Sequence, residues 1–100
     1  MTVPLRTRAN LKAAGRQMAT EAVAALAAHY ATLRPDEMTE ALEDRLLAEM
    51  AFAMHATAES YRSLGVPAPW IAKFRSTFIR TAGEGCRALG LTLLPAAGSA

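Results

Sequence analysis

Cysteine, aromatic residues and long apolar runs are all scarce in this sequence, and each shortage excludes a class of protein. With Cys86 as the only cysteine, no intramolecular disulfide can form, which argues against a small disulfide-stabilised secreted domain. Cys86 itself is predicted to be a small buried side chain. No apolar run approaches the roughly 20 residues of a membrane-spanning helix. We therefore expect a cytoplasmic protein that does not enter a membrane.

The residues that usually carry chemistry are equally sparse. The two histidines, His29 and His55, and the single cysteine follow no recognised metal-ligand spacing, so neither a metal nor another cofactor is predicted. His55 and Glu59 lie four residues apart and could meet on one helix face, but no nucleophile or second acid lies at a matching spacing. We interpret them as an exposed ion pair and expect no enzymatic activity.

Alanine is abundant, and it determines the expected fold class. The chain contains 23 alanines and is 52% hydrophobic with only six aromatic residues. Alanine, leucine, methionine, glutamate and arginine are strong helix formers, so the sequence predicts an all-α protein. A chain of 100 residues allows one domain over 1–100, and a lone domain of that size is marginally stable, which favours a dimer.

Apolar periodicity predicts a first helix over about residues 8–33. Leucine, alanine and methionine recur there at steps of three and four residues. Four basic residues precede an alanine-rich run, as they do in a targeting peptide, but Glu21 and His29 interrupt that run. We therefore interpret this segment as part of the mature fold.

A second helix is predicted over about residues 37–63, because Pro35 ends the first helix and Asp36 can cap the next. Acidic residues fill its first turns, where the helix dipole favours negative charge. Its apolar residues form two adjoining lines, wide enough to touch two neighbours: Met38, Leu42, Leu46, Met50, Ala53, Tyr61 and Leu64, with Leu47, Met54 and Ala58 beside them. So long a helix favours an elongated hairpin or a dimer.

A glycine and two prolines predict a tight corner before a third helix. Gly65 suits the left-handed conformation that ends a helix, and the third helix is predicted over about residues 69–89. Gly83 and Gly85 predict either a break in that helix or a crossing with no room for a side chain. Gly90 is predicted to end the third helix. Residues 90–100 are predicted to be a tail, whose first apolar residues fold back as a short cover.

Short connections make successive helices antiparallel neighbours. We therefore predict a three-helix, up-down-up elongated bundle in which helices 1 and 2 form a long antiparallel hairpin. Residues 1–33 carry four basic and one acidic side chain, residues 34–60 two basic and seven acidic, and residues 61–100 five basic and one acidic. This order suits a middle helix that packs against both others.

Residues 60–80 resemble a helix-turn-helix motif, the DNA-reading unit of many transcriptional regulators. Gly65 occupies the place of the turn glycine, and Val66 and Phe74 fall at inward-facing positions, but Tyr61 stands where the motif usually has a very small residue. The residues that this resemblance would place on DNA are Lys73, Arg75, Ser76 and Arg80. Of the positions that would face the major groove, only Lys73 could do much to read a base edge, and Arg75 and Arg80 could hold phosphates without specifying a sequence. We therefore prefer a plain corner of a bundle.

The leading functional prediction is a non-enzymatic protein–protein interaction module that acts through an exposed apolar helix face, such as a small adaptor, inhibitor or regulatory subunit. We expect an unidentified protein partner and a homodimer, and the alternative is a DNA-binding regulator that uses residues 60–80. The residues assigned to partner binding are Trp70, Phe74, Phe78, Met50, Met54, Arg75 and Arg80. The two arginines would supply charge at the rim of the interface.

Overall fold

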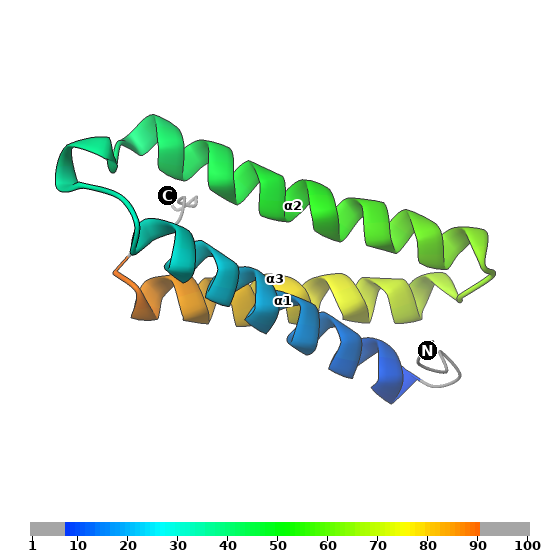
Figure 1. Cartoon of the computed structure of the whole chain (residues 1–100). Helices are drawn as coiled ribbons and strands as arrows, with labels where there is room; N and C mark the ends of the chain where they lie inside the picture. The colour runs from blue at the N-terminus through cyan, green and yellow to red at the C-terminus, as the bar shows by residue number, and fades with distance from the viewer. Residues whose placement is uncertain (1–7, 91–100) are drawn as a thin grey trace, which may run out of the picture.

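A computed structural model describes residues 8–90, which form three α-helices and one short 3-10 helix. The helix α1 spans Arg8–Tyr30, η1 spans Pro35–Glu37, α2 spans Glu40–Ser63 and α3 spans Ala68–Ala88. No strand occurs in this part of the chain. The three helices run up, down and up, which confirms the predicted all-α class (Figure 1).

The predicted hairpin of the first two helices is wrong, because α1 packs mainly on α3. Figure 1 shows α1 crossing close against α3, whereas α2 diverges from both toward its N-terminal end. Small residues decide this pairing: Gly15 and Ala19 are both buried on α1. A Cβ atom added to Gly15 would lie 2.6 Å from the backbone oxygen of Phe74, so the two backbones meet there.

The core lies between α1 and α3 and reaches only part of α2. Within α2, which is described along its whole length, only Met54 and Ala58 are buried. Cys86 is 1% exposed, which confirms its predicted burial in the last helix. The core cluster consists of Leu11, Ala19, Met54, Ala58, Phe74, Phe78 and Ala82. The predicted apolar cover over 91–95 lies outside the described residues.

In the connection between α1 and α2, the observed helix boundaries differ from the predicted ones. The first helix ends at Tyr30 rather than near residue 33, and the second begins at Glu40 because Pro35–Glu37 form a separate turn. Thr39, not the predicted Asp36, caps α2: its hydroxyl oxygen accepts a hydrogen bond from a first-turn amide at 3.2 Å.

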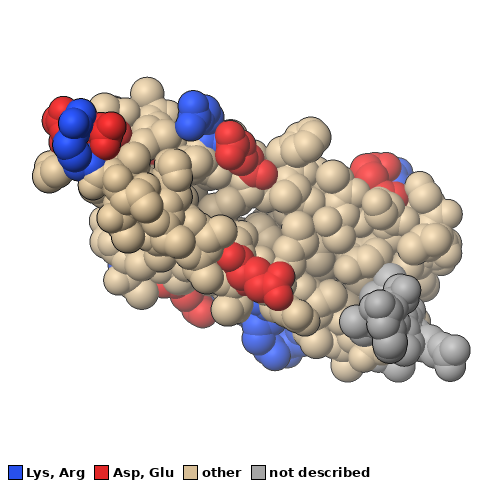
Figure 2. Space-filling view, viewed as in Figure 1, with Lys and Arg blue, Asp and Glu red and all other residues tan. Residues whose placement is uncertain are grey.

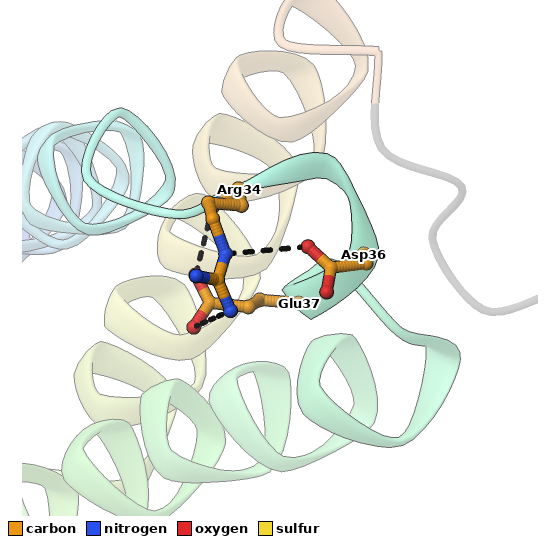
Figure 3. A network of polar contacts seen from close by, with 3 residues as sticks. All are labelled: Arg34, Asp36 and Glu37. Atoms are coloured by element: carbon orange, nitrogen blue, oxygen red, sulfur yellow. Dashed lines mark hydrogen bonds and ion pairs between the residues drawn. The ribbon is translucent and has the colours of Figure 1, made fainter.

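Asp36 instead belongs to a network of three charged residues, Arg34, Asp36 and Glu37, that contact one another within the connection between α1 and α2 (Figure 3). The Nε atom of Arg34 lies 3.4 Å from Oδ1 of Asp36, and its Nη2 atom lies 3.8 Å from Oε2 of Glu37. The backbone amide of Arg34 also donates a hydrogen bond to Oε1 of Glu37 at 2.8 Å. All three side chains are exposed, so each ion pair contributes less than about 1 kcal/mol.

Two predicted glycine roles are confirmed by the backbone. Gly65 and Gly90 have φ angles of 85° and 82°, the left-handed conformation that ends α2 and α3. The third helix continues through Gly83 and Gly85 without a break. A Cβ atom on Gly85 would lie 2.9 Å from both methyl groups of Val23, so the crossing alternative is the correct one there.

Replacing Gly85 by alanine is expected to lower stability, although alanine is the better helix former. Val23 is β-branched and has one favoured rotamer in a helix, so it cannot easily turn away from the new methyl group. Overpacking of about 2 kcal/mol then outweighs a propensity gain of about 1 kcal/mol. In a Val23→Ala background the same change should instead raise the free energy of unfolding by about 1 kcal/mol.

Urea denaturation of the wild type, the two single variants and the double variant measures the expected loss of stability in the wild-type background and the expected gain in the Val23→Ala background. A Gly85→Ala variant that is more stable than the wild type would contradict the close contact with Val23.

Candidate protein-interaction groove

An apolar groove of about 340 Å³ lies between α2 and α3. It is lined by Leu47, Met50, Ala51, Met54 and His55 from α2, and by Phe78, Ile79, Ala82, Gly83 and Cys86 from α3. The groove exists because the two helices diverge and because several of the residues between them are small. Of its lining residues only His55 and Cys86 can ionise. The groove is therefore suited to binding the apolar side of a ligand.

A second hollow, of about 300 Å³, lies between the same two helices near their corner. It is lined by Ala58, Glu59 and Arg62 from α2, and by Ala68, Ile71, Ala72 and Arg75 from α3. Arg75 precedes Ile79 by four residues and therefore lies on the same side of α3 as the apolar groove. We call the two hollows together the α2/α3 groove, with an apolar end and a basic corner.

The basic corner contains an unsatisfied donor. The Nε atom of Arg75 is buried and has no hydrogen-bond partner within residues 8–90. A guanidinium does not lose its proton in a protein, and buried donors normally have an acceptor. Because that atom is closed to other molecules, a ligand could reach only the remaining, half-buried part of the Arg75 side chain, which lines the corner.

The basic residues of α3 are not neutralised by α2. In the described part of the chain every ion pair is local: Arg34 with Asp36 and Glu37, Arg45 with Glu49, and Arg62 with Glu59. Glu59 therefore pairs with Arg62 and not with His55, the partner that the sequence suggested. The basic side chains of α3, which are Lys73, Arg75, Arg80 and Arg87, remain available for another molecule.

A third hollow, of about 340 Å³, separates α2 from α1 on its other side. It is lined by Ala22, Ala25, Leu26 and His29 from α1, and by Leu46, Glu49, Met50 and Ala53 from α2. Figure 2 shows this face of the molecule, where the surface is hollowed beside α2 and much of it carries no charged side chain. Among residues 8–90, little thus covers the N-terminal half of α2 on either side.

The structure brings together four of the seven residues assigned to partner binding from the sequence. Met50, Met54 and Phe78 line the apolar end of the groove, and Arg75 lines its basic corner. The other three lie elsewhere: Phe74 is fully buried in the core, Trp70 is half-buried and packs against the core outside the groove, and Arg80 is exposed away from it.

Sequence reasoning missed Ile79, the most exposed large apolar residue of the groove, at 59% exposure. Ile79 lies outside the four-residue spacing that marks the core face of α3, so the apolar periodicity did not identify it as a binding residue. Its position one residue after Phe78, and therefore about 100° further around the helix, was the available signal.

Three of the four residues considered for DNA contact, Lys73, Ser76 and Arg80, fall within about 60° of one another around α3, and only Arg75 lies elsewhere. Arg75 lines the groove, whereas Arg80 follows it by five residues and lies about 140° around the helix. Lys73 is half-buried, and the hydroxyl of Ser76 donates a hydrogen bond to the backbone oxygen of Lys73 at 3.2 Å.

The groove offers little reactive chemistry. Burial raises the pKa of the Cys86 thiol, and the negative charge of Glu43 raises it further, so Cys86 is protonated at neutral pH and is a poor nucleophile. Burial also raises the pKa of Tyr61, which packs edge-on against Phe74 with ring centroids 5.1 Å apart. Residues 8–90 contain no group of three side chains that could hold a metal ion.

The described chain is therefore an all-helical, three-helix protein with an open groove beside its middle helix. None of the helices in the described part combines the length and the apolar character needed to cross a membrane. No protein-family model, curated protein or solved structure matches this chain. A proposal for its function must rest on the geometry of the groove.

Proposed function

We propose that this protein is a non-enzymatic interaction module, a small adaptor, inhibitor or regulatory subunit, whose α2/α3 groove receives an amphipathic helix of a partner protein. The observation that supports this is the open apolar groove with Ile79 exposed on its wall. Met50 lines it and is only half-buried, and a methionine side chain adapts readily to the shape of a bound helix.

The charges of the groove indicate the chemistry of that partner. Arg75 lines the corner, and the basic residues of α3 lack ion-pair partners in the described part of the chain. The partner helix would place apolar side chains at steps of three and four residues along the groove. An aspartate or glutamate near one end of that helix would pair with Arg75.

Two observations favour this proposal over DNA binding through residues 60–80. Figure 1 shows α2 and α3 side by side and running in opposite directions, without the steep crossing of a helix-turn-helix unit. In addition, Arg75 lies about 140° around α3 from Arg80, so the two arginines do not form one basic face.

An Ile79→Glu variant is expected to lose its protein partner. Ile79 is 59% exposed, so the substitution should leave the fold intact while placing a charge in the apolar groove. The matched control is Thr20→Glu, which adds the same charge at an exposed position of α1. Circular dichroism should show that both variants are as helical as the wild type.

The measurement has two stages. Proteins retained from a cell lysate by immobilised wild type, Ile79→Glu and Thr20→Glu are compared, and the relevant partner is one that only Ile79→Glu loses. Titration of that purified partner should then show a Kd at least about tenfold higher for Ile79→Glu than for Thr20→Glu. If every retained protein binds Ile79→Glu as well as the wild type, the groove is not the binding site.

A further inference from the structure

The side of α2 that faces away from the core carries an exposed aromatic residue that the groove does not use. Phe52 is 75% exposed, the largest exposed fraction among the large apolar residues of the described chain. It lies two residues before the buried Met54 and therefore about 200° around the helix. Nothing within residues 8–90 covers it.

The residues around Phe52 form a symmetric pattern. At distances of four and eleven residues on both sides of Phe52 the side chains are small, and at seven residues they carry opposite charges. At about 100° per residue these positions fall within an arc of about 80°, and every one of them is exposed. We call this set the outer stripe: Ala41, Arg45, Ala48, Phe52, Ala56, Glu59 and Ser63.

We propose that the outer stripe is the interface of a twofold-symmetric homodimer, in which α2 pairs antiparallel with α2 of a second copy about an axis at Phe52. Such an axis places each residue opposite the one that lies equally far on the other side of Phe52. Ala48 then faces Ala56 of the second copy, where two small residues let the helices approach closely. Arg45 faces Glu59 of the second copy, and the opposite charges attract.

Two ion pairs within each copy extend the charge pattern of the proposed interface. Arg45 lies 3.8 Å from Glu49, and Glu59 pairs with Arg62, and all four side chains are exposed. In the dimer these two pairs meet end to end, so their charges alternate along the interface. A parallel pairing would instead place Arg45 against Arg45 and Glu59 against Glu59, so the charges select the antiparallel orientation.

The dimer is expected to be reversible and weak. A single pair of 24-residue helices about 36 Å long forms an interface at the small end of the range for specific complexes. Its Kd is therefore expected to be roughly micromolar or higher. Of the outer stripe only Glu59 also lines the α2/α3 groove, so the dimer leaves the apolar end of the groove open.

Charge reversal of the full chain, followed by sedimentation velocity over a concentration series, tests the pairing. The wild type should show a concentration-dependent change from monomer to dimer. Arg45→Glu alone places two carboxylates opposite each other, at position 45 of one copy and at Glu59 of the second. Glu59→Arg alone places Arg45 against another arginine. Each single variant should dimerise at least about tenfold more weakly than the wild type. Arg16→Glu, an exposed charge reversal on α1, is the matched control and should dimerise normally.

An equimolar mixture of the two single variants gives the decisive result. In the heterodimer the carboxylate introduced at position 45 of one copy faces the guanidinium introduced at position 59 of the other. The unchanged Arg45 and Glu59 also face each other, so dimerisation should return to near the wild-type Kd. Changes within one helix, such as the altered Arg45–Glu49 pair, cannot be repaired by mixing.

A monomeric wild type, single variants that dimerise normally, or a mixture that fails to recover would each overturn the proposal. These outcomes are independent of the Ile79→Glu result, because Ile79 lies outside the outer stripe.

Discussion

Replacing Gly15 by alanine is expected to lower the free energy of unfolding by about 2 kcal/mol. The added Cβ atom would lie 2.6 Å from the backbone oxygen of Phe74 and 3.3 Å from the backbone nitrogen of Phe78. Backbone atoms within a helix cannot rotate away, so α1 and α3 would have to separate. We expect that overpacking to cost about 3 kcal/mol, against a propensity gain of about 1 kcal/mol for alanine.

Thermal unfolding should show this loss as a melting temperature lower by roughly 10 °C for a domain of this size. Val23→Ala should not rescue Gly15→Ala, because the clash at Gly15 involves the backbone of α3 and not a side chain. This distinguishes Gly15 from Gly85, where the same substitution should be rescued. A Gly15→Ala variant as stable as the wild type would mean that α1 and α3 do not approach as closely as described.

The same contact explains why the helix pairing could not be predicted from the sequence. Connection length indicated that α1 should pair with α2, the next helix in the chain. Gly15 and Ala19 lie on the face of α1 that meets α3, and their lack of bulk allows a closer approach than the larger leucines and methionines of α2 allow. The sequence contained these small residues, but periodicity alone did not say which helix they face.

The local features of the chain were predicted more successfully than its packing. The backbone is left-handed at Gly65 and Gly90, where α2 and α3 end. Glycine adopts this conformation at little cost because it has no Cβ atom, so the residue type alone indicates these helix ends. The cap of α2 was placed at Asp36 instead of Thr39, because Asp36 and Thr39 both suit that position and only the structure shows Asp36 paired with Arg34.

The candidate groove was predictable only in part. Met50, Met54 and Phe78 follow the apolar periodicity, so their clustering could be expected. Ile79 and Phe52 lie away from those stripes. The exposure of Ile79 depends on how far α2 diverges from α3, whereas Phe52 is exposed because it lies on the side of α2 opposite the buried Met54. That divergence is a tertiary property, which the periodicity of a single helix does not determine.

Phe74→Ala is expected to be the most destabilising single change considered, at about 4 kcal/mol. Phe74 is fully buried, and its ring packs edge-on with Tyr61 at 5.1 Å. The substitution removes the buried ring together with its contact with Tyr61 and leaves a cavity in the core. Because such a loss is a large part of the stability of a small domain, Phe74→Leu, with an expected loss of about 2 kcal/mol, is the variant to measure if Phe74→Ala does not fold.

Phe52→Ala is the matched control, because it removes the same side chain from a position that is 75% exposed. Urea denaturation at a concentration well below the expected Kd of the dimer, where the monomer predominates, should show a change within about 0.5 kcal/mol for Phe52→Ala. The same variant should nevertheless dimerise more weakly than the wild type at high concentration, since Phe52 lies at the centre of the outer stripe. A Phe52→Ala variant as unstable as Phe74→Ala would show that Phe52 faces the core, and α2 would then have to be rotated about its axis.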